Sequence, residues 1–287
     1  MNLVRVPGGD LAAYSFGKGP PVIFLHGGPG DTHDYMMRMA EPLFDQFQCI
    51  FFDQRGTGGS SNFKREKSEF KIDLLLNDIR AIASHFGITT PALVGHSWGA
   101  MYALFALIRF PREFCKAALV GMGPLDADMS QKTAEHLISI LTPEEQIEWS
   151  DLRKQRSTAR NAGSKERVEE IDHKLMHLRV KAWVFNPDLR AKFLEEYFLD
   201  PPPDRIVNKW VWSSAETWFS WDSLQNVHDA IWICAGANDS VPLSQTERVL
   251  LGAKAASASV IKECGHIPWL EHPEIFYHEL RKFLSAQ

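Results

Sequence analysis

The chain has 287 residues, of which 45% are hydrophobic and 23% are charged. This composition supports a large packed core and excludes an intrinsically disordered chain. The formal net charge of -5 gives no electrostatic reason to expect nucleic acid or an anionic membrane as a partner.

The amino-terminal segment and the cysteines indicate the compartment. "MNLVRVPGGDLAAY" (1–14) lacks the charged region and long apolar run of a secretion signal. No stretch approaches the roughly 20 apolar residues that a membrane span needs. The cysteines have no metal or redox spacing and lie in or beside apolar runs, which predicts four buried, reduced thiols: Cys49, Cys115, Cys234 and Cys264. We expect a cytoplasmic protein.

The first predicted element is an antiparallel hairpin over residues 3–17, with its turn at "PGGD" (7–10) and its place at a sheet edge. Short apolar runs that stop at Gly or Asp predict buried strands within 21–28, 49–56, 91–97, 116–123 and 229–239. Apolar residues at steps of three and four predict a helix over 70–87. Strands that alternate with helices predict a mostly parallel sheet covered on both faces.

Residues 124–215 break this alternation. They are rich in charge and contain no buried-strand run, and a helix start is predicted at Thr142, with Pro143 in the first turn and Glu145 three residues after the cap. The prolines of "DPPPDR" (200–205) predict a stiff turn or linker. We therefore expect a helical insertion at 124–215 between two parts of one core, 1–123 and 216–287.

The stretch "LVGHSWGAM" (93–101) places Ser97 between Gly95 and Gly99 where a strand should end and a helix should begin. Such a turn strains the residue at its apex and requires small neighbours two positions before and after it. The serine hydroxyl then stands clear at the carboxyl edge of the sheet. Ser97 is therefore the predicted nucleophile.

A serine nucleophile needs a base, and the base needs a carboxylate to orient it. One later apolar run ends at Asp239 and another ends just before His266, in the chain order Ser, Asp, His. Asp126, which follows "LVGMGPL" (119–125), is the alternative acid. Three histidines compete with His266 and are expected to have other roles: His96, His272 and His278.

The oxyanion formed by nucleophilic attack requires two hydrogen-bond donors. The N–H of Trp98, directly after the nucleophile, is one candidate. The glycines of "FLHGGPG" (24–30) follow the third predicted strand and let the backbone approach a substrate carbonyl, so the N–H of Gly28 is the other.

Three stretches now show a resemblance: "HGGPGDTHDY" (26–35), "DQRGTGGSS" (53–61) and "GHSWGA" (95–100). On these motifs the chain resembles the α/β-hydrolase fold over nearly its whole length, and within it the proline iminopeptidases and related serine aminopeptidases. The resemblance implies a mostly parallel eight-stranded sheet flanked by helices, with residues 124–215 as a helical cap over the site. It also implies Ser97, Asp239 and His266 as the triad.

Exopeptidases of this family hold the substrate's α-ammonium group with acidic residues, chiefly in the cap. "FLEEYF" (193–198) offers Glu195 and Glu196 in a similar context. The chain departs from the family at Asn186, where some members carry a glutamate, and at Ser240, where certain members carry another. Five tryptophans could line a pocket for a proline ring or dock the cap on the core: Trp183, Trp210, Trp212, Trp218 and Trp221.

The sequence thus predicts a serine hydrolase that forms an acyl-enzyme on a small molecule or short peptide, with neither metal nor organic cofactor. The first predicted activity is release of an amino-terminal proline or small residue. A carboxylesterase or lactonase is the alternative, and an inactive hydrolase fold used for binding is a third hypothesis.

Overall fold

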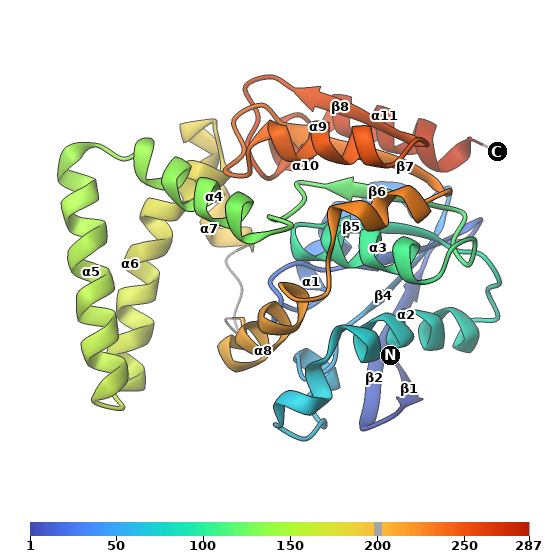
Figure 1. Ribbon diagram of the computed structural model, residues 1–287, viewed down its shortest axis with the longest axis horizontal. Helices are drawn as coiled ribbons and strands as arrows, with labels where there is room; N and C mark the ends of the chain where they lie inside the picture. The colour runs from blue at the N-terminus through green and yellow to red at the C-terminus, as the bar shows by residue number, and fades with distance from the viewer. Residues whose placement is uncertain (198–202, 287) are drawn as a thin grey trace.

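A single eight-stranded sheet runs through the computed structural model, which describes residues 1–197 and 203–286 (Figure 1). The strand order is β1-β2-β4-β3-β5-β6-β7-β8. The strands β3 to β8 are mutually parallel where they pair, and β2 is antiparallel to β1 and β4. The strands are β1 (Asn2–Val6), β2 (Gly9–Phe16), β3 (Pro21–Leu25), β4 (Gln48–Phe52), β5 (Ala92–His96), β6 (Lys116–Val120), β7 (Ala230–Gly236) and β8 (Ala256–Ile261). The mostly parallel sheet predicted from the apolar runs is confirmed.

The amino-terminal hairpin lies at one edge of this sheet, as predicted. Val4 on β1 is paired with Leu11 on β2, and both side chains are buried. Gly8 has a φ of 94°, a conformation that favours glycine, and makes the tight turn between the two strands. The hairpin therefore extends the sheet by antiparallel pairing.

Helices cover both faces of the sheet. On one face, α2 (Ile72–His85), α3 (Trp98–Arg109) and α9 (Leu243–Gly252) bury apolar side chains in the larger core cluster. On the other face, α1 (Asp34–Ala40) and α11 (Pro273–Ser285) contribute to the second cluster. The helix predicted over 70–87 is confirmed as α2, and its apolar stripe is buried. The remaining short core elements are α10 (Pro268–Glu271) and the 3-10 turns η1 (Glu41–Leu43), η2 (Gly58–Ser60), η3 (Lys67–Phe70) and η4 (Trp221–Asn226).

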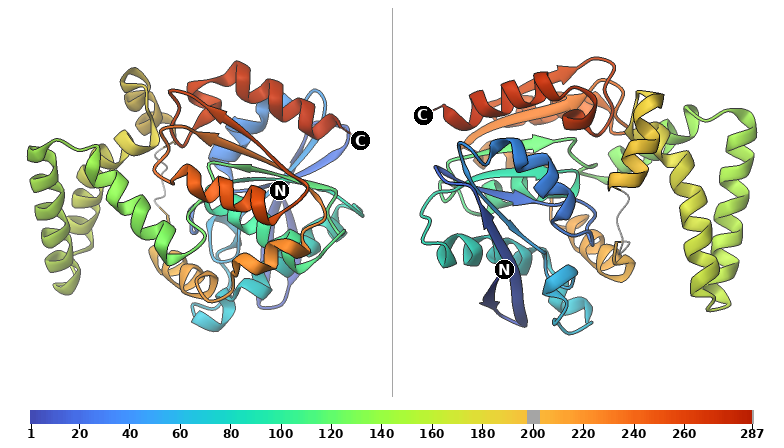
Figure 2. Two further views of the ribbon diagram at one scale, coloured as in Figure 1. Left: turned by 45° about the horizontal axis from the view of Figure 1, so that its top comes forward. Right: turned by 180° about the vertical axis from the view of Figure 1, so that it is seen from behind.

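The described part of 124–215 contains helices and no strand: α4 (Ala127–Ser139), α5 (Pro143–Asn161), α6 (Lys165–Trp183), α7 (Pro187–Tyr197) and α8 (Arg205–Ala215). The predicted helix start is present as a capping box between Thr142 and Glu145 at the beginning of α5. The α5–α6 pair projects from the body of the molecule (Figures 1 and 2). It holds a small apolar cluster of its own, which includes Trp149 and Ile171.

Helix α8 returns the insertion to the core. Its side chains Val207, Val211 and Ala215 are buried in the larger core cluster. Ser214 Oγ also accepts a hydrogen bond from the N–H of Ile72 at 3.0 Å, at the start of α2. The end of the insertion is thus packed against α2.

The prediction for the cysteines holds at three of the four positions. Cys115 is exposed, which corrects the prediction of four buried thiols; it lies in the turn before β6, whereas Cys49 and Cys234 lie on buried strands. Part of the predicted linker at 200–205 lies outside the described residues. In the described part of the chain, no helix has the length and apolarity needed to cross a membrane.

Candidate active site

Ser97 lies at the sharp turn between β5 and α3. Its φ of 55° and ψ of -119° are strained for a residue with a side chain. A Cβ on Gly99 would lie 1.9 Å from the backbone oxygen of Leu25, and a Cβ on Gly95 would lie 2.1 Å from that of Gly99. Only glycine fits at these two positions, so the strand and the helix meet closely enough to present a half-buried Ser97 at the sheet edge.

His266 and Asp239 form a buried pair at the same edge of the sheet. Asp239 follows β7 and His266 follows β8, and Nδ1 of His266 lies 2.8 Å from Oδ2 and 3.1 Å from Oδ1 of Asp239. Because a carboxylate only accepts, Nδ1 carries the proton and Nε2 is left as the acceptor. This tautomer allows His266 to take a proton from a nucleophile.

The loop that carries His266 contacts the turn that carries Ser97. The ring of His96, next to Ser97, donates from Nε2 to the backbone oxygen of His266 at 3.1 Å. A Cβ on Gly121 would lie 3.1 Å from Nδ1 of His266. The structure thus gathers the three predicted triad residues from the ends of β5, β7 and β8.

The competing residues have other partners. The Asp126 carboxylate accepts from the N–H of Met129 at 2.8 Å, as the cap of α4, and from Nε1 of Trp221 at 2.6 Å. Nε2 of His272 donates to the backbone oxygen of Glu263, and His278 is exposed on α11. Of the two candidate acids, Asp239 is the one that contacts His266.

The glycine loop after β3 lies over Ser97. A Cβ on Gly27 would be 3.3 Å from Cβ of Ser97. The N–H of Gly27 already donates to the Tyr35 hydroxyl at 2.5 Å. Within the described residues, the N–H groups of Gly28 and Trp98 have no acceptor. These are the two donors that the sequence predicts for an oxyanion, and that role stays a prediction.

Tyr35 links this loop to the base, a role that sequence reasoning missed. Its hydroxyl accepts from Gly27 and lies 3.0 Å from Nδ1 of His96, to which it donates because Nε2 of His96 carries the proton. Burial lowers the pKa of His96 well below its ordinary value, so this ring is neutral. The chain Gly27, Tyr35, His96, His266 therefore fixes the glycine loop relative to the base. The only signal was the place of Tyr35 at the end of the quoted motif "HGGPGDTHDY".

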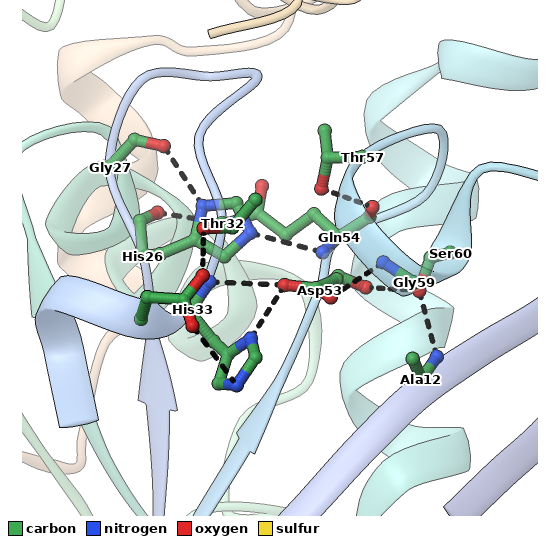
Figure 3. A network of polar contacts seen from close by, with 11 residues as sticks. Ala12, His26, Gly27, Thr32, His33, Asp53, Gln54, Thr57, Gly59 and Ser60 are labelled. Atoms are coloured by element: carbon green, nitrogen blue, oxygen red, sulfur yellow. Dashed lines mark hydrogen bonds and ion pairs between the residues drawn. The ribbon is translucent and has the colours of Figure 1, made fainter. Parts of the chain in front are cut away.

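A second polar network supports the glycine loop from the side of β4 (Figure 3). Nε2 of His26 accepts from the N–H of Gln54 at 3.0 Å, and the Gln54 amide returns a bond to the backbone oxygen of His26 at 2.8 Å. Burial lowers the pKa of His26 to about 4, so the ring accepts in its neutral form. Oε1 of Gln54 accepts from the Trp98 indole at 2.9 Å. Gln54 thus joins the two elements that carry the candidate oxyanion donors.

Asp53 holds the next part of the same loop (Figure 3). Its Oδ1 accepts from the N–H of His33 at 3.0 Å and from Nδ1 of His33 at 2.8 Å, and its Oδ2 accepts from the N–H of Gly59 at 2.8 Å. Although burial raises the pKa of Asp53, the bonds and charge of His33 bring it below its ordinary value. The carboxylate is therefore ionised and ties the glycine loop to the turn after β4.

The corner between α6 and α7 lies against the His266 loop. The Trp183 ring stacks on that of His266 with 6.0 Å between centroids, and the backbone oxygen of Trp183 accepts from the N–H of His266 at 2.7 Å. Glu271 accepts from the N–H of Gly265 at 2.7 Å and from that of Asn186 at 3.0 Å. The insertion is thus bound directly to the loop of the candidate base.

The two glutamates predicted to bind a substrate ammonium group, Glu195 and Glu196, differ in exposure. Glu195 is exposed and Glu196 is half-buried, and neither has a hydrogen bond or ion pair in the described residues. Asn186 accepts from the N–H of Asp188 at 3.0 Å, and Ser240 donates to Oδ1 of Asp239 at 3.2 Å. In the part of the chain that the structure describes, Trp183 is the one of the five tryptophans that contacts the candidate base. Four pack against the larger core cluster: Trp210, Trp212, Trp218 and Trp221.

The chain is similar to known proteins both in sequence and in fold. Residues 20–150 match the family described as the alpha/beta hydrolase fold. The chain has the α/β-hydrolase fold. A proline iminopeptidase of Clostridioides difficile (strain 630) is 29% identical over 127 residues, which are 44% of this chain and 43% of that relative. The match therefore spans less than half the length of the relative.

Solved structures match nearly the whole chain. The proline iminopeptidase of Mycobacterium smegmatis has a TM-score of 0.72 and 20% identity, with 99% of this chain and 97% of that one covered. An esterase from Exiguobacterium antarcticum has a TM-score of 0.74 and 17% identity, with 99% and 98% covered. At these identities the structural likeness shows the fold alone. The predicted resemblance is confirmed, and together the comparisons support a hydrolase.

Proposed function

We propose that this α/β hydrolase is a serine hydrolase that releases an amino-terminal proline or another small residue from short peptides. The observation that carries the proposal is the His266–Asp239 pair at 2.8 Å, beside a serine held at a φ of 55°. A binding module has no need of a strained serine, an oriented base and two free N–H donors at one sheet edge. The match to proline iminopeptidases supports the choice of substrate.

In the proposed reaction, Oγ of Ser97 attacks the carbonyl carbon while Nε2 of His266 takes its proton. Asp239 keeps the imidazole in the required tautomer and stabilises the imidazolium. The N–H groups of Gly28 and Trp98 donate to the oxyanion. His266 then protonates the leaving amine and activates the water that releases the acyl group.

A carboxylesterase acting through the same residues is the second candidate. The exposed position of Glu195 favours it, because an exposed carboxylate is a weak clamp for a substrate ammonium. The structural likeness to an esterase is compatible with it but shows only the fold.

The test compares kcat/KM on proline β-naphthylamide, its N-acetylated form and a short-chain p-nitrophenyl ester. An aminopeptidase should prefer the free amine by about a hundredfold, or about 2.7 kcal/mol. Turnover of the ester alone would favour the esterase. Ser97→Ala should reduce each measurable rate by about 10⁴-fold or more, and full retention of activity would reject the triad.

The cytoplasm remains our proposed compartment, since all four cysteines are free thiols.

A further inference from the structure

Asp31 is a carboxylate on the glycine loop that none of the networks above uses. It is half-buried, and within the described residues its side chain has neither a hydrogen bond nor an ion pair. Asp34, three residues later, is exposed and accepts from the Thr32 hydroxyl at 2.5 Å. A half-buried carboxylate without a partner loses hydration without compensation, so a cation from outside the chain would stabilise it.

The position of Asp31 relates it to the reacting atoms. A Cβ on Gly28 would lie 3.3 Å from Cγ of Asp31, so the carboxylate lies beside the candidate oxyanion donor. The preceding glycine is in contact distance of Ser97, where a Cβ on Gly27 would be 3.3 Å from Cβ of the serine. Gly27 therefore lies next to the nucleophile, and Gly28, the next residue of the loop, lies next to Asp31.

The returning insertion covers this part of the loop. The N–H of Asp204 donates to the backbone oxygen of Gly30 at 2.9 Å, and the Asn208 side chain donates to that of Pro29 at 2.7 Å. The Asp204 carboxylate is paired with Arg65 at 2.8 Å, and Arg205 is paired with Asp172. The residues before Asp31 are thus held between the core and α8.

Negative charge at this position has opposite effects on two kinds of substrate. An uncompensated carboxylate close to an oxyanion hole opposes the negative charge that develops on the substrate oxygen. A substrate with a positive group beside its carbonyl neutralises the carboxylate and removes that penalty. Burial raises the pKa of Asp31 to about 6, which leaves the group ionised at neutral pH.

We propose that Asp31 is the residue that binds the positively charged α-amino group of the substrate and selects free amines over neutral acyl compounds. This inference rests on the proposed serine hydrolase. It places the ammonium site on the oxyanion loop instead of on the cap glutamates, of which Glu195 is exposed.

The experiment compares the unmodified protein with Asp31→Asn, which keeps the shape and removes the charge. Asp34→Asn is the matched control, since it removes an exposed carboxylate from the same segment. For each protein we would measure kcat/KM on proline β-naphthylamide and on p-nitrophenyl acetate, and the Kd of prolinamide by calorimetry. N-acetylprolinamide serves as the uncharged ligand.

Asp31→Asn should reduce kcat/KM for the free amine by about 10- to 100-fold, the range of a hydrogen bond to a charged group. It should weaken the binding of prolinamide by a similar factor. The value of kcat/KM on the ester should stay unchanged or rise by up to about tenfold. Asp34→Asn should change none of these values more than about twofold.

Equal losses on the amine and the ester would overturn the assignment, because they would indicate a distorted loop. It would also be overturned if prolinamide bound equally well to both proteins, or not at all to the unmodified one. If peptides are not cleaved but prolinamide binding still depends on Asp31, the ammonium site stands and the aminopeptidase proposal fails.

Discussion

Replacing Gly99 with alanine should strongly destabilise the fold. A Cβ on Gly99 would lie 1.9 Å from the oxygen and 2.6 Å from the carbon of the Leu25 carbonyl. Both are backbone atoms of β3, which is paired with β4 and β5 on its two sides, so they cannot rotate away. Relief requires α3 and β3 to separate. Overpacking a closed core costs about 1–3 kcal/mol and more where the backbone must move, so we expect a loss of at least about 3 kcal/mol.

Gly87→Ala is the matched control. Gly87 has a φ of 67°, but apart from its own chain neighbours no described atom lies within 4 Å of the position its Cβ would take. The left-handed conformation alone should cost about 1–2 kcal/mol. At about 2–4 °C of Tm per kcal/mol, Gly87→Ala should melt about 2–8 °C lower. The same conversion lowers the Tm of Gly99→Ala by at least about 6–12 °C, so Gly99→Ala should show the larger shift. Circular dichroism melts would measure both. Equal shifts, or an unchanged Tm for Gly99→Ala, would refute the steric account of the turn at Ser97.

Three further changes test other parts of the structure. Asp239→Asn should lower kcat about 10⁴-fold, whereas Asp126→Asn should change it less than about twofold; the reverse order in steady-state kinetics would assign the acid to Asp126. Burial lowers the pKa of His26 to about 4. Between about pH 6.5 and 4 the histidine is therefore protonated in the unfolded chain and neutral in the folded one. The free energy of unfolding should fall by up to about 3 kcal/mol as the pH drops through this range. In urea melts, the free energy of unfolding of His26→Gln should depend less steeply on pH than that of the unmodified protein. An unchanged pH dependence would show that His26 does not cause it. Asp78→Asn leaves the Arg55 guanidinium, 2.6 Å from Oδ1 and 1% exposed, without its buried partner; it should cost about 3–5 kcal/mol in urea unfolding, and a loss below about 1 kcal/mol would contradict this.

The sequence was sufficient for those features that depend on local pattern. Buried parallel strands are short apolar runs, and their ends mark where polar groups meet at one sheet edge. Ser97 and Asp239 follow such runs, whereas His266 follows β8, an edge strand in which only Ile261 is buried. The sequence could therefore place all three at one sheet edge, and their joint role as a triad stays a prediction. The hairpin and the capping box at Thr142 are likewise encoded within a few neighbouring residues.

Other features depend on contacts between distant residues and carry no periodic signal. Tyr35 and His96 are 61 residues apart in the chain, and Glu271 bonds to Asn186 across 85 residues. A single polar side chain in an otherwise ordinary segment does not indicate which backbone group it will reach. The exposure of Cys115 was mispredicted for a related reason, since the end of an apolar run and the turn beside it look alike in composition.

The candidate base is held from two sides, and this bears on how the insertion acts. From the core, His96 donates to the backbone oxygen of His266, and Asp239 fixes the ring. From the insertion, Trp183 accepts from the N–H of His266 and stacks on its ring. The N–H of Asn186, just before α7, donates to Glu271 of the core, which also accepts from the N–H of Gly265. A displacement of the α6–α7 corner therefore alters the contacts of His266 directly. On the proposed mechanism, the insertion therefore helps to position the base.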